Sequence, residues 1–248
     1  GPWRDAHLHI AAHGEELEAI SLRTCTSVAE CLETIAKASL DAPPEGWISA
    51  RHARIEAWQE QRWPTRQELD EATSGRCAFV QSFDHHALAA STLALDQTGM
   101  TGYSGGGVVE RDAKGDLTGL LLEDAANAFL AGLPPKTDAQ VRADIERAQS
   151  DLLKRGFVEV HDMHTSAAMA RALRAMEHDG ALELKVWLYA TPEHFEDVVR
   201  ELGDPVGIGG TGEGGRLTFR GMKLFTDGTL NSRTAHMLHP FRDAIPEH

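Results

Sequence analysis

Two histidines near the start of the chain, His7 and His9 in the stretch DAHLHI, are separated by a single apolar residue. In a β-strand, side chains two residues apart project from the same face, so both imidazoles would point the same way while Leu8 points the other way. Two imidazoles on one face can bind one metal ion. Asp5 shares that face and could orient a ligand histidine as a hydrogen-bond acceptor. Because the chain has 13 histidines, the pair could also arise by chance. A second sequence element is needed to distinguish a metal-binding pair from a chance pair.

A lysine in an apolar strand is that second element. Lys223 lies in GMKLFTDGTLNSRTA (221–235), within a strand predicted over 217–225. Burying an ammonium group without a partner is costly, whereas a neutral amine can react with carbon dioxide and become a carbamate, an anionic oxygen ligand that can bridge two metal ions. The alternative is a lysine that pairs with Asp227 or extends its charged end to solvent. Asp227 and Gly228 are typical of a turn at a strand end.

Regular alternation in the second half of the chain predicts the elements that position these residues. The helices predicted there span 138–155 and 166–179, with a third that begins at Thr191-Pro192, and the strands span 157–161, 182–189 and 217–225. Strands that alternate with helices are usually parallel and joined by right-handed crossovers. This pattern predicts the α/β class, as a sheet or a barrel.

The first half has a less regular pattern. Ser27 followed by Glu30 is a capping-box pair that predicts a helix to about residue 40. A short buried strand is expected over 78–83 and a helix over 87–95. Alternating residues on both sides of an Asp-Ala-Lys-Gly turn predict a β-hairpin insertion near 104–124.

Composition limits the function classes. The chain has 248 residues, a formal charge of −14 and no apolar run long enough to span a bilayer. The acidic balance argues against nucleic acid as a partner and favours a small neutral or cationic substrate. Three cysteines without a CxxC motif suggest neither a disulfide framework nor a zinc knuckle, which makes the cytoplasm the expected compartment.

Taken together, these stretches resemble the metal-dependent amidohydrolase superfamily, and specifically amidohydrolase family 3, whose members include an N-substituted formamide deformylase. The matching stretches are DAHLHI, SFDHHALAAST (82–92), GGGVVERDAKGDLTGLLLEDA (105–125), GFVEVHDM (156–163) and the segment around Lys223. They cover most of the chain in the expected order. The resemblance implies a (β/α)8 TIM-type barrel with its site at the carboxyl ends of the strands.

The resemblance also implies roles for individual residues. His7 and His9 correspond to the metal ligands of the first strand, and Lys223 to the carboxylated lysine. The substrate-binding residues expected are His86, Glu123, His161 and Asp227. A capped turn at His86 is nearly as plausible, and a solvated hairpin end at Glu123 is equally plausible. For His164, a loop role is expected rather than metal ligation. Enzymes of the superfamily add two histidines and an aspartate from later strands. We therefore expect residues 1–248 to form a partial barrel domain of about five strands, in which the general acid and base are not identified.

These inferences predict an amidohydrolase that cleaves a C–N bond of the amide type with water activated by a divalent metal. Zinc is the first choice, as one or two ions, although iron, manganese and nickel accept the same ligands. The expected partner is a small-molecule substrate, with no nucleic acid and no membrane, and a homo-oligomer is an option. Two alternatives remain open: a hydrolase of the same fold that acts on an ester, lactone or phosphoester, and a non-catalytic fragment that needs a partner chain.

Overall fold

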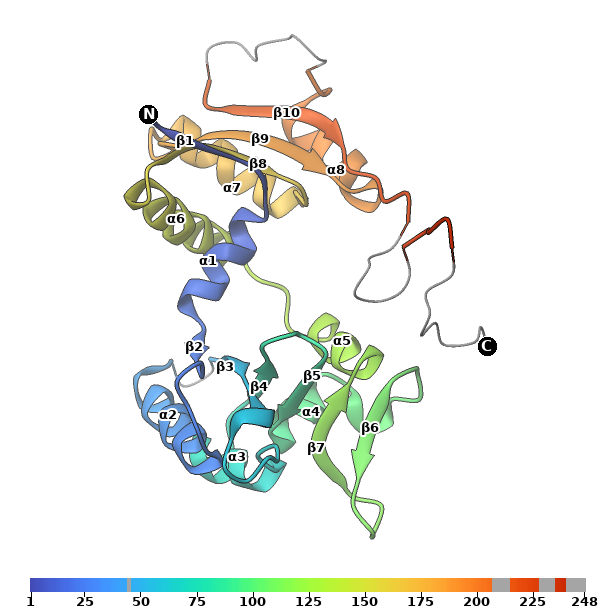
Figure 1. Ribbon diagram of the computed structural model, residues 1–248. Coiled ribbons are helices and arrows are strands. Elements are labelled where there is room, and N and C mark those ends of the chain that lie inside the picture. Colours follow the sequence, from blue (N-terminus) through green and yellow to red (C-terminus); the bar gives the residue numbers. More distant parts are fainter. Residues whose placement is uncertain (44–45, 207–214, 228–234, 240–248) are drawn as a thin grey trace. The chain divides into compact units, whose positions relative to one another are not determined.

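The computed structural model describes residues 1–43, 46–206, 215–227 and 235–239 (Figure 1). The chain divides into two compact units, and each is described by itself. Unit 1 consists of residues 1–17 and 136–248, and unit 2 consists of residues 18–135. Among the described residues, no helix has both the length and the apolar composition that crossing a bilayer requires. The three cysteines are free, as the sequence predicts.

Unit 1 is built on a sheet of four parallel strands in the order β1-β8-β9-β10. Its elements are β1 (Trp3–Leu8), α1 (Ile10–Glu18), α6 (Asp138–Lys154), β8 (Phe157–Asp162), α7 (Ala167–His178), β9 (Lys185–Ala190), α8 (Pro192–Leu202) and β10 (Leu217–Met222). The register pairs Leu8 with Asp162 and Met222 with Ala190. The carboxyl ends of all four strands therefore meet at one edge, where His9 and Lys223 follow β1 and β10.

Helices pack on one face of this sheet and form the core of unit 1 (Figure 1). Fully buried Val160 and Val186 from the strands pack in the same cluster as Ile145 of α6 and Leu173 of α7. A side-chain cap fixes the start of α6, because Thr137 and Gln140 form a capping box. The helices predicted over 138–155 and 166–179 are thus confirmed within one or two residues.

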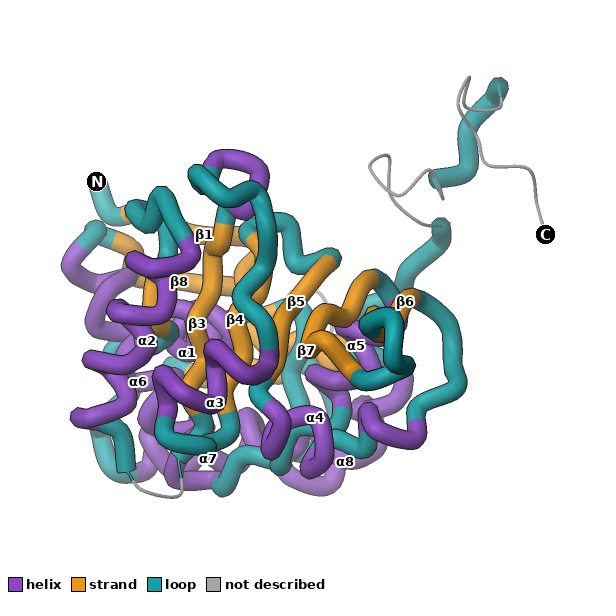
Figure 2. The backbone as a smooth tube through the Cα atoms, turned by 90° about the horizontal axis from the view of Figure 1, so that it is seen from below, coloured by secondary structure: helices purple, strands orange, loops and turns teal. Residues whose placement is uncertain are grey.

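Unit 2 contains a mixed sheet of six strands in the order β2-β3-β4-β5-β7-β6 (Figure 2). Its elements are β2 (Ile20–Ser21), α2 (Val28–Asp41), β3 (Ile48–Ala53), η1 (Ile55–Ala57), α3 (Arg66–Thr73), β4 (Ala78–Ser82), β5 (Ala87–Ala90), α4 (Thr92–Gln97), η2 (Met100–Gly102), β6 (Val108–Arg111), β7 (Leu117–Leu122) and α5 (Asp124–Ala131). Both faces of β4 are buried, since Val80 and Phe79 belong to two different hydrophobic clusters.

Several details differ from the sequence prediction. The segment 87–95 is not one helix: Ala87–Ala90 form β5, which is antiparallel to β4 and β7, and a helix begins only after Ser91, whose side chain caps it. The hairpin β6–β7 forms as predicted, but β7 joins it to the six-stranded sheet. The predicted strand 217–225 ends at Met222.

The barrel prediction is confirmed in its α/β class and in its parallel strands with covering helices, but the described residues do not form a closed barrel. The parallel sheet of unit 1 has four strands rather than about five, because the strand predicted over 78–83 belongs to the sheet of unit 2.

Candidate metal centre

His7 and His9 lie side by side at the carboxyl end of β1. Their ring centroids are 5.6 Å apart and their planes are nearly perpendicular, at 82°. Both residues are exposed. The Asp5 carboxylate accepts a hydrogen bond of 2.9 Å from the backbone amide of His7, so it supports the strand end rather than an imidazole. The two imidazoles are therefore adjacent and accessible to a ligand.

This arrangement is compatible with one shared metal ion. With metal–nitrogen bonds of ~2.0–2.1 Å and near-tetrahedral angles, two imidazoles on one ion have centroids about 5–6 Å apart. The observed separation of 5.6 Å lies in that range. The donor set of imidazole nitrogens suits zinc and other divalent transition metals better than calcium or magnesium.

Lys223 is the first residue after β10, and it is half-buried. Its amide donates a hydrogen bond of 2.8 Å to the carbonyl of Ala190, which holds the backbone against the end of β9. Its Nζ atom lies 5.0 Å from the ring centroid of Phe225. The side chain thus begins at the same sheet edge as His9, although outside the strand in which the sequence analysis placed it.

The electrostatic environment of His9 links these residues. Partial desolvation by surrounding atoms is the largest effect and lowers the pKa of His9, while the negative charge of Asp162 raises it. The charges of His164, His7 and Lys223 lower this pKa further. A lower pKa favours the neutral imidazole, which is the form that binds metal.

Asp162 is a positioning residue that the sequence analysis did not identify. Its side chain is fully buried at the end of β8. It accepts hydrogen bonds from the amide of Ile10 at 2.9 Å and the hydroxyl of Thr165 at 2.6 Å. Burial raises the pKa of this carboxyl group. Because Ile10 follows His9 directly, Asp162 fixes the backbone beside the imidazole pair; the only signal in the sequence was a carboxylate at a strand end.

His161 and Asp227 lie elsewhere in unit 1. His161 is on β8, where its half-buried ring stacks on Trp187 at 5.7 Å and on Tyr189 at 6.0 Å. Asp227 is exposed and accepts a hydrogen bond of 2.9 Å from the amide of His236. Within the described part of the chain, no hydrogen bond or ring contact joins either side chain to His7 or His9, so their substrate-binding roles stay predictions.

His86 and Glu123 form a pair of their own in unit 2. The Nδ1 atom of His86 lies 2.8 Å from a carboxylate oxygen of Glu123, and the Glu123 amide donates a bond of 2.8 Å to the carbonyl of His86. The hydrogen bond to Glu123 raises the pKa of His86. Glu123 has a φ of 54°, a strained value for a residue with a side chain. This pairing does not test the substrate-binding role expected of the two residues, which stays a prediction.

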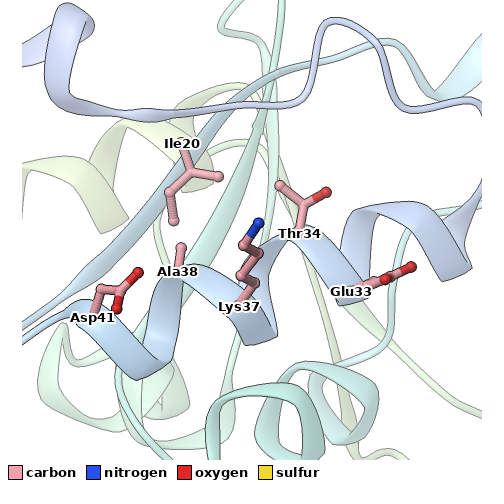
Figure 3. Close-up of a pocket in the computed structure, with 6 residues that line it drawn as sticks. All are labelled: Ile20, Glu33, Thr34, Lys37, Ala38 and Asp41. Atoms are coloured by element: carbon pink, nitrogen blue, oxygen red, sulfur yellow. The ribbon is translucent and has the colours of Figure 1, made fainter.

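The surface of α2 in unit 2 carries a shallow pocket (Figure 3). Its lining residues come from β2 and α2: Ile20, Glu33, Thr34, Lys37, Ala38 and Asp41. The lining contains no histidine or cysteine. This pocket is therefore a poor candidate for a transition-metal site.

The sequence is similar to those of two known proteins. The sequence is 27% identical over 254 residues to YtcJ of Bacillus subtilis (strain 168), covering 96% of this chain and 45% of that protein. It is 28% identical over 245 residues to the N-substituted formamide deformylase of Arthrobacter pascens, covering 94% of this chain and 44% of that protein. The chain thus spans less than half the length of these relatives.

The chain is also similar to less than half of two solved structures. An uncharacterized metal-dependent hydrolase from Pyrococcus horikoshii OT3 superposes with a TM-score of 0.75 at 26% identity, over 94% of this chain and 44% of that one. A similar protein from Pyrococcus furiosus has a TM-score of 0.73 at 26% identity. The sequence model of amidohydrolase family 3 matches residues 4–248, which include both units. The resemblance noted from the sequence is thereby confirmed, and the chain belongs to the amidohydrolase family.

Proposed function

We propose that this protein is a metal-dependent hydrolase that cleaves a C–N bond of the amide type. The observation that carries the proposal is the contact between His7 and His9, with ring centroids 5.6 Å apart at the strand edge from which Lys223 also emerges. Family membership supports a hydrolase. The names of two similar proteins, a metal-dependent hydrolase and an N-substituted formamide deformylase, support the metal and the C–N bond respectively.

His7 and His9 would hold the metal, with zinc as our first choice and one or two ions per site. A divalent ion held there would supply a water with a pKa of about 7 and would polarise a carbonyl group. The chain's own contribution is orientation. Asp162 anchors the amide of Ile10, and this bond keeps His9 at the strand end.

Lys223 would provide an anionic ligand after carboxylation. In this step the neutral Nζ amine adds to the carbon of carbon dioxide: an N–C bond forms, one C=O π bond breaks with its electron pair moving to oxygen, and an N–H bond breaks as one proton is released to solvent. The product is a carbamate with two oxygen donors. Lys223 is half-buried and follows β10 at the sheet edge where His9 follows β1, which is consistent with this role.

A small molecule is the proposed substrate, and His86, Glu123, His161 and Asp227 are the proposed substrate contacts. His86 and Glu123 are exposed and lie 2.8 Å apart in unit 2. An imidazole and a carboxylate in contact can donate and accept hydrogen bonds to a polar substrate group. Cytoplasmic location and a homo-oligomeric state also remain proposals.

The test is hydrolysis by the zinc-loaded protein of four substrate types: an N-substituted formamide, an ester, a lactone and a phosphoester. We expect turnover of the formamide and its loss in the double variant His7→Ala/His9→Ala. His178→Ala is the matched control, because the His178 side chain is 88% exposed at the end of α7 in the same unit. Turnover of only the ester, lactone or phosphoester would overturn the C–N assignment. Full activity in the double variant would overturn the metal mechanism.

A further inference from the structure

A second group of metal-ligating side chains lies in unit 1 and shares no residue with the predicted centre. His164 is in the loop that follows β8, as the sequence predicts, and Glu193 and His194 are in the first turn of α8. One ligand atom of each residue lies within 4.8 Å of the others. The ring centroids of His164 and His194 are 5.7 Å apart. Within the described residues, this is the group of three histidine, cysteine or carboxylate side chains close enough to hold an ion.

Local hydrogen bonds hold both backbone segments in place. The amide of Thr165, next to His164, donates a bond of 3.0 Å to the carbonyl of Tyr189. The Thr165 hydroxyl bonds the buried Asp162 carboxylate at 2.6 Å. Pro192 occupies the first turn of α8, where its fixed backbone angle favours the helix. The three side chains therefore project from rigid backbone, which is what a metal site requires.

The donor chemistry selects a transition metal. Two imidazoles and one carboxylate leave positions open for water, and this set suits zinc, nickel, cobalt or copper better than the harder calcium and magnesium ions. Two imidazoles on one such ion have centroids about 5–6 Å apart, as argued for His7 and His9. The observed 5.7 Å between His164 and His194 meets that condition.

We infer that His164, Glu193 and His194 form a second, accessory site for a divalent transition metal at the rim of the sheet edge. It is a neighbour of the predicted centre, since the rings of His164 and His9 are 6.0 Å apart. The positive end of the α8 dipole disfavours a cation at this position, and the Glu193 carboxylate offsets it. Because His164 and Glu193 are exposed, the accessory site should bind more weakly and exchange faster than a buried site.

The experiment is a calorimetric titration of the metal-free protein with zinc chloride. In the double variant His7→Ala/His9→Ala, we expect one zinc ion to bind still. Adding His194→Ala to that variant should weaken this binding by at least about tenfold, since one of three protein ligands is lost. Adding His178→Ala instead should leave it unchanged. Far-UV circular dichroism checks that each variant is folded, and His164→Ala is the second variant if His194→Ala fails this check.

The zinc titrations test the accessory site separately from the proposed centre at His7 and His9. If the double variant binds no zinc, or if His194→Ala and His164→Ala leave its zinc affinity unchanged, the accessory site is wrong. The predicted centre is judged from a different comparison, between the wild type and the double variant. A protein in which only the His194 substitution reduces binding would support the accessory site and refute the centre at His7 and His9.

Discussion

Replacing Gly14 with alanine should destabilise unit 1, although alanine is the better helix former. Gly14 is buried in α1 where this helix crosses α6. A Cβ atom at this position would lie 1.8 Å from the carbonyl oxygen of Asp144 and 2.5 Å from its carbonyl carbon. Both are backbone atoms, so no side-chain rotation relieves the contact. The helices would have to separate by roughly 1.2 Å, the difference between 1.8 Å and the shortest separations of about 3.0 Å that Cβ atoms show.

Two effects of opposite sign can be compared. Glycine to alanine in a helix interior stabilises by up to about 1 kcal/mol through backbone entropy. Overpacking of a close-packed contact typically costs about 1–3 kcal/mol, and more when backbone must move. Separation would also strain the hydrogen bond of 3.2 Å from Arg147 Nε to the carbonyl of Gly14. We therefore expect a net loss of about 1–3 kcal/mol in the free energy of unfolding.

Gly14→Ala should also weaken zinc binding at His7 and His9, because α1 begins at Ile10, directly after His9. A shift of α1 would move the imidazole away from its partner and weaken zinc binding. Ala12→Gly is the matched control, since Ala12 is exposed in the same helix and loses only helix propensity, about 1 kcal/mol. Urea unfolding measures the stability of both variants and calorimetry their zinc affinity. If Gly14→Ala proves more stable than the wild type, or binds zinc as tightly, the steric reasoning is refuted.

Two further predictions concern charges in unit 2. The hydrogen bond from Arg62 lowers the pKa of Glu68 to about 2, so this carboxylate stabilises the fold above its ordinary pKa, and the contribution is lost as pH falls from about 4.5 towards 2. Since both side chains are partly exposed, Glu68→Gln should lower the free energy of unfolding by only about 1 kcal/mol at pH 7 and by less at pH 3. Urea unfolding measures this loss. The exposed control Glu71→Gln should leave the free energy of unfolding unchanged at either pH. The second prediction is that Glu123→Gln lowers the raised pKa of His86 towards 6.5 in an NMR titration. In the wild type the His86–Glu123 pair stabilises the folded state below pH 6.5. This stabilisation is lost as the pH rises through the raised pKa that His86 has in the folded state. Equal midpoints for His86 in the wild type and in Glu123→Gln would show that the ion pair does not form in solution.

The parts of the fold that the sequence predicted correctly are those with strong local signals. The helix at 138–155 has both a capping pair at its start and a glycine after its end, and it was placed almost to the residue. The segment 87–95 has no such signal at Ala87, and pairing with two other strands decided its conformation. The Ser91 cap was present in the sequence and indicates where the helix begins.

The candidate site likewise has features that the local sequence predicts and features that depend on residues distant in the sequence. The spacing of His7 and His9 is a local property, so a strand pattern was enough to predict that their rings are adjacent. Asp162 could not be assigned its role from the sequence, because its partner Ile10 is 152 positions away. The contact between His164 and His194 likewise depends on the pairing of β8 with β9. Interactions between strands that are distant in the sequence become visible only once the sheet order is known.

The most direct test of the central claim is an NMR titration with zinc that observes the imidazole nitrogens of each histidine in the metal-free protein. If His7 and His9 share an ion, a ring nitrogen of each should shift together as zinc is added, while the exposed His178 remains unchanged until zinc is in excess. Ring nitrogens of His7 and His9 that stay at their metal-free positions throughout the titration would contradict the account.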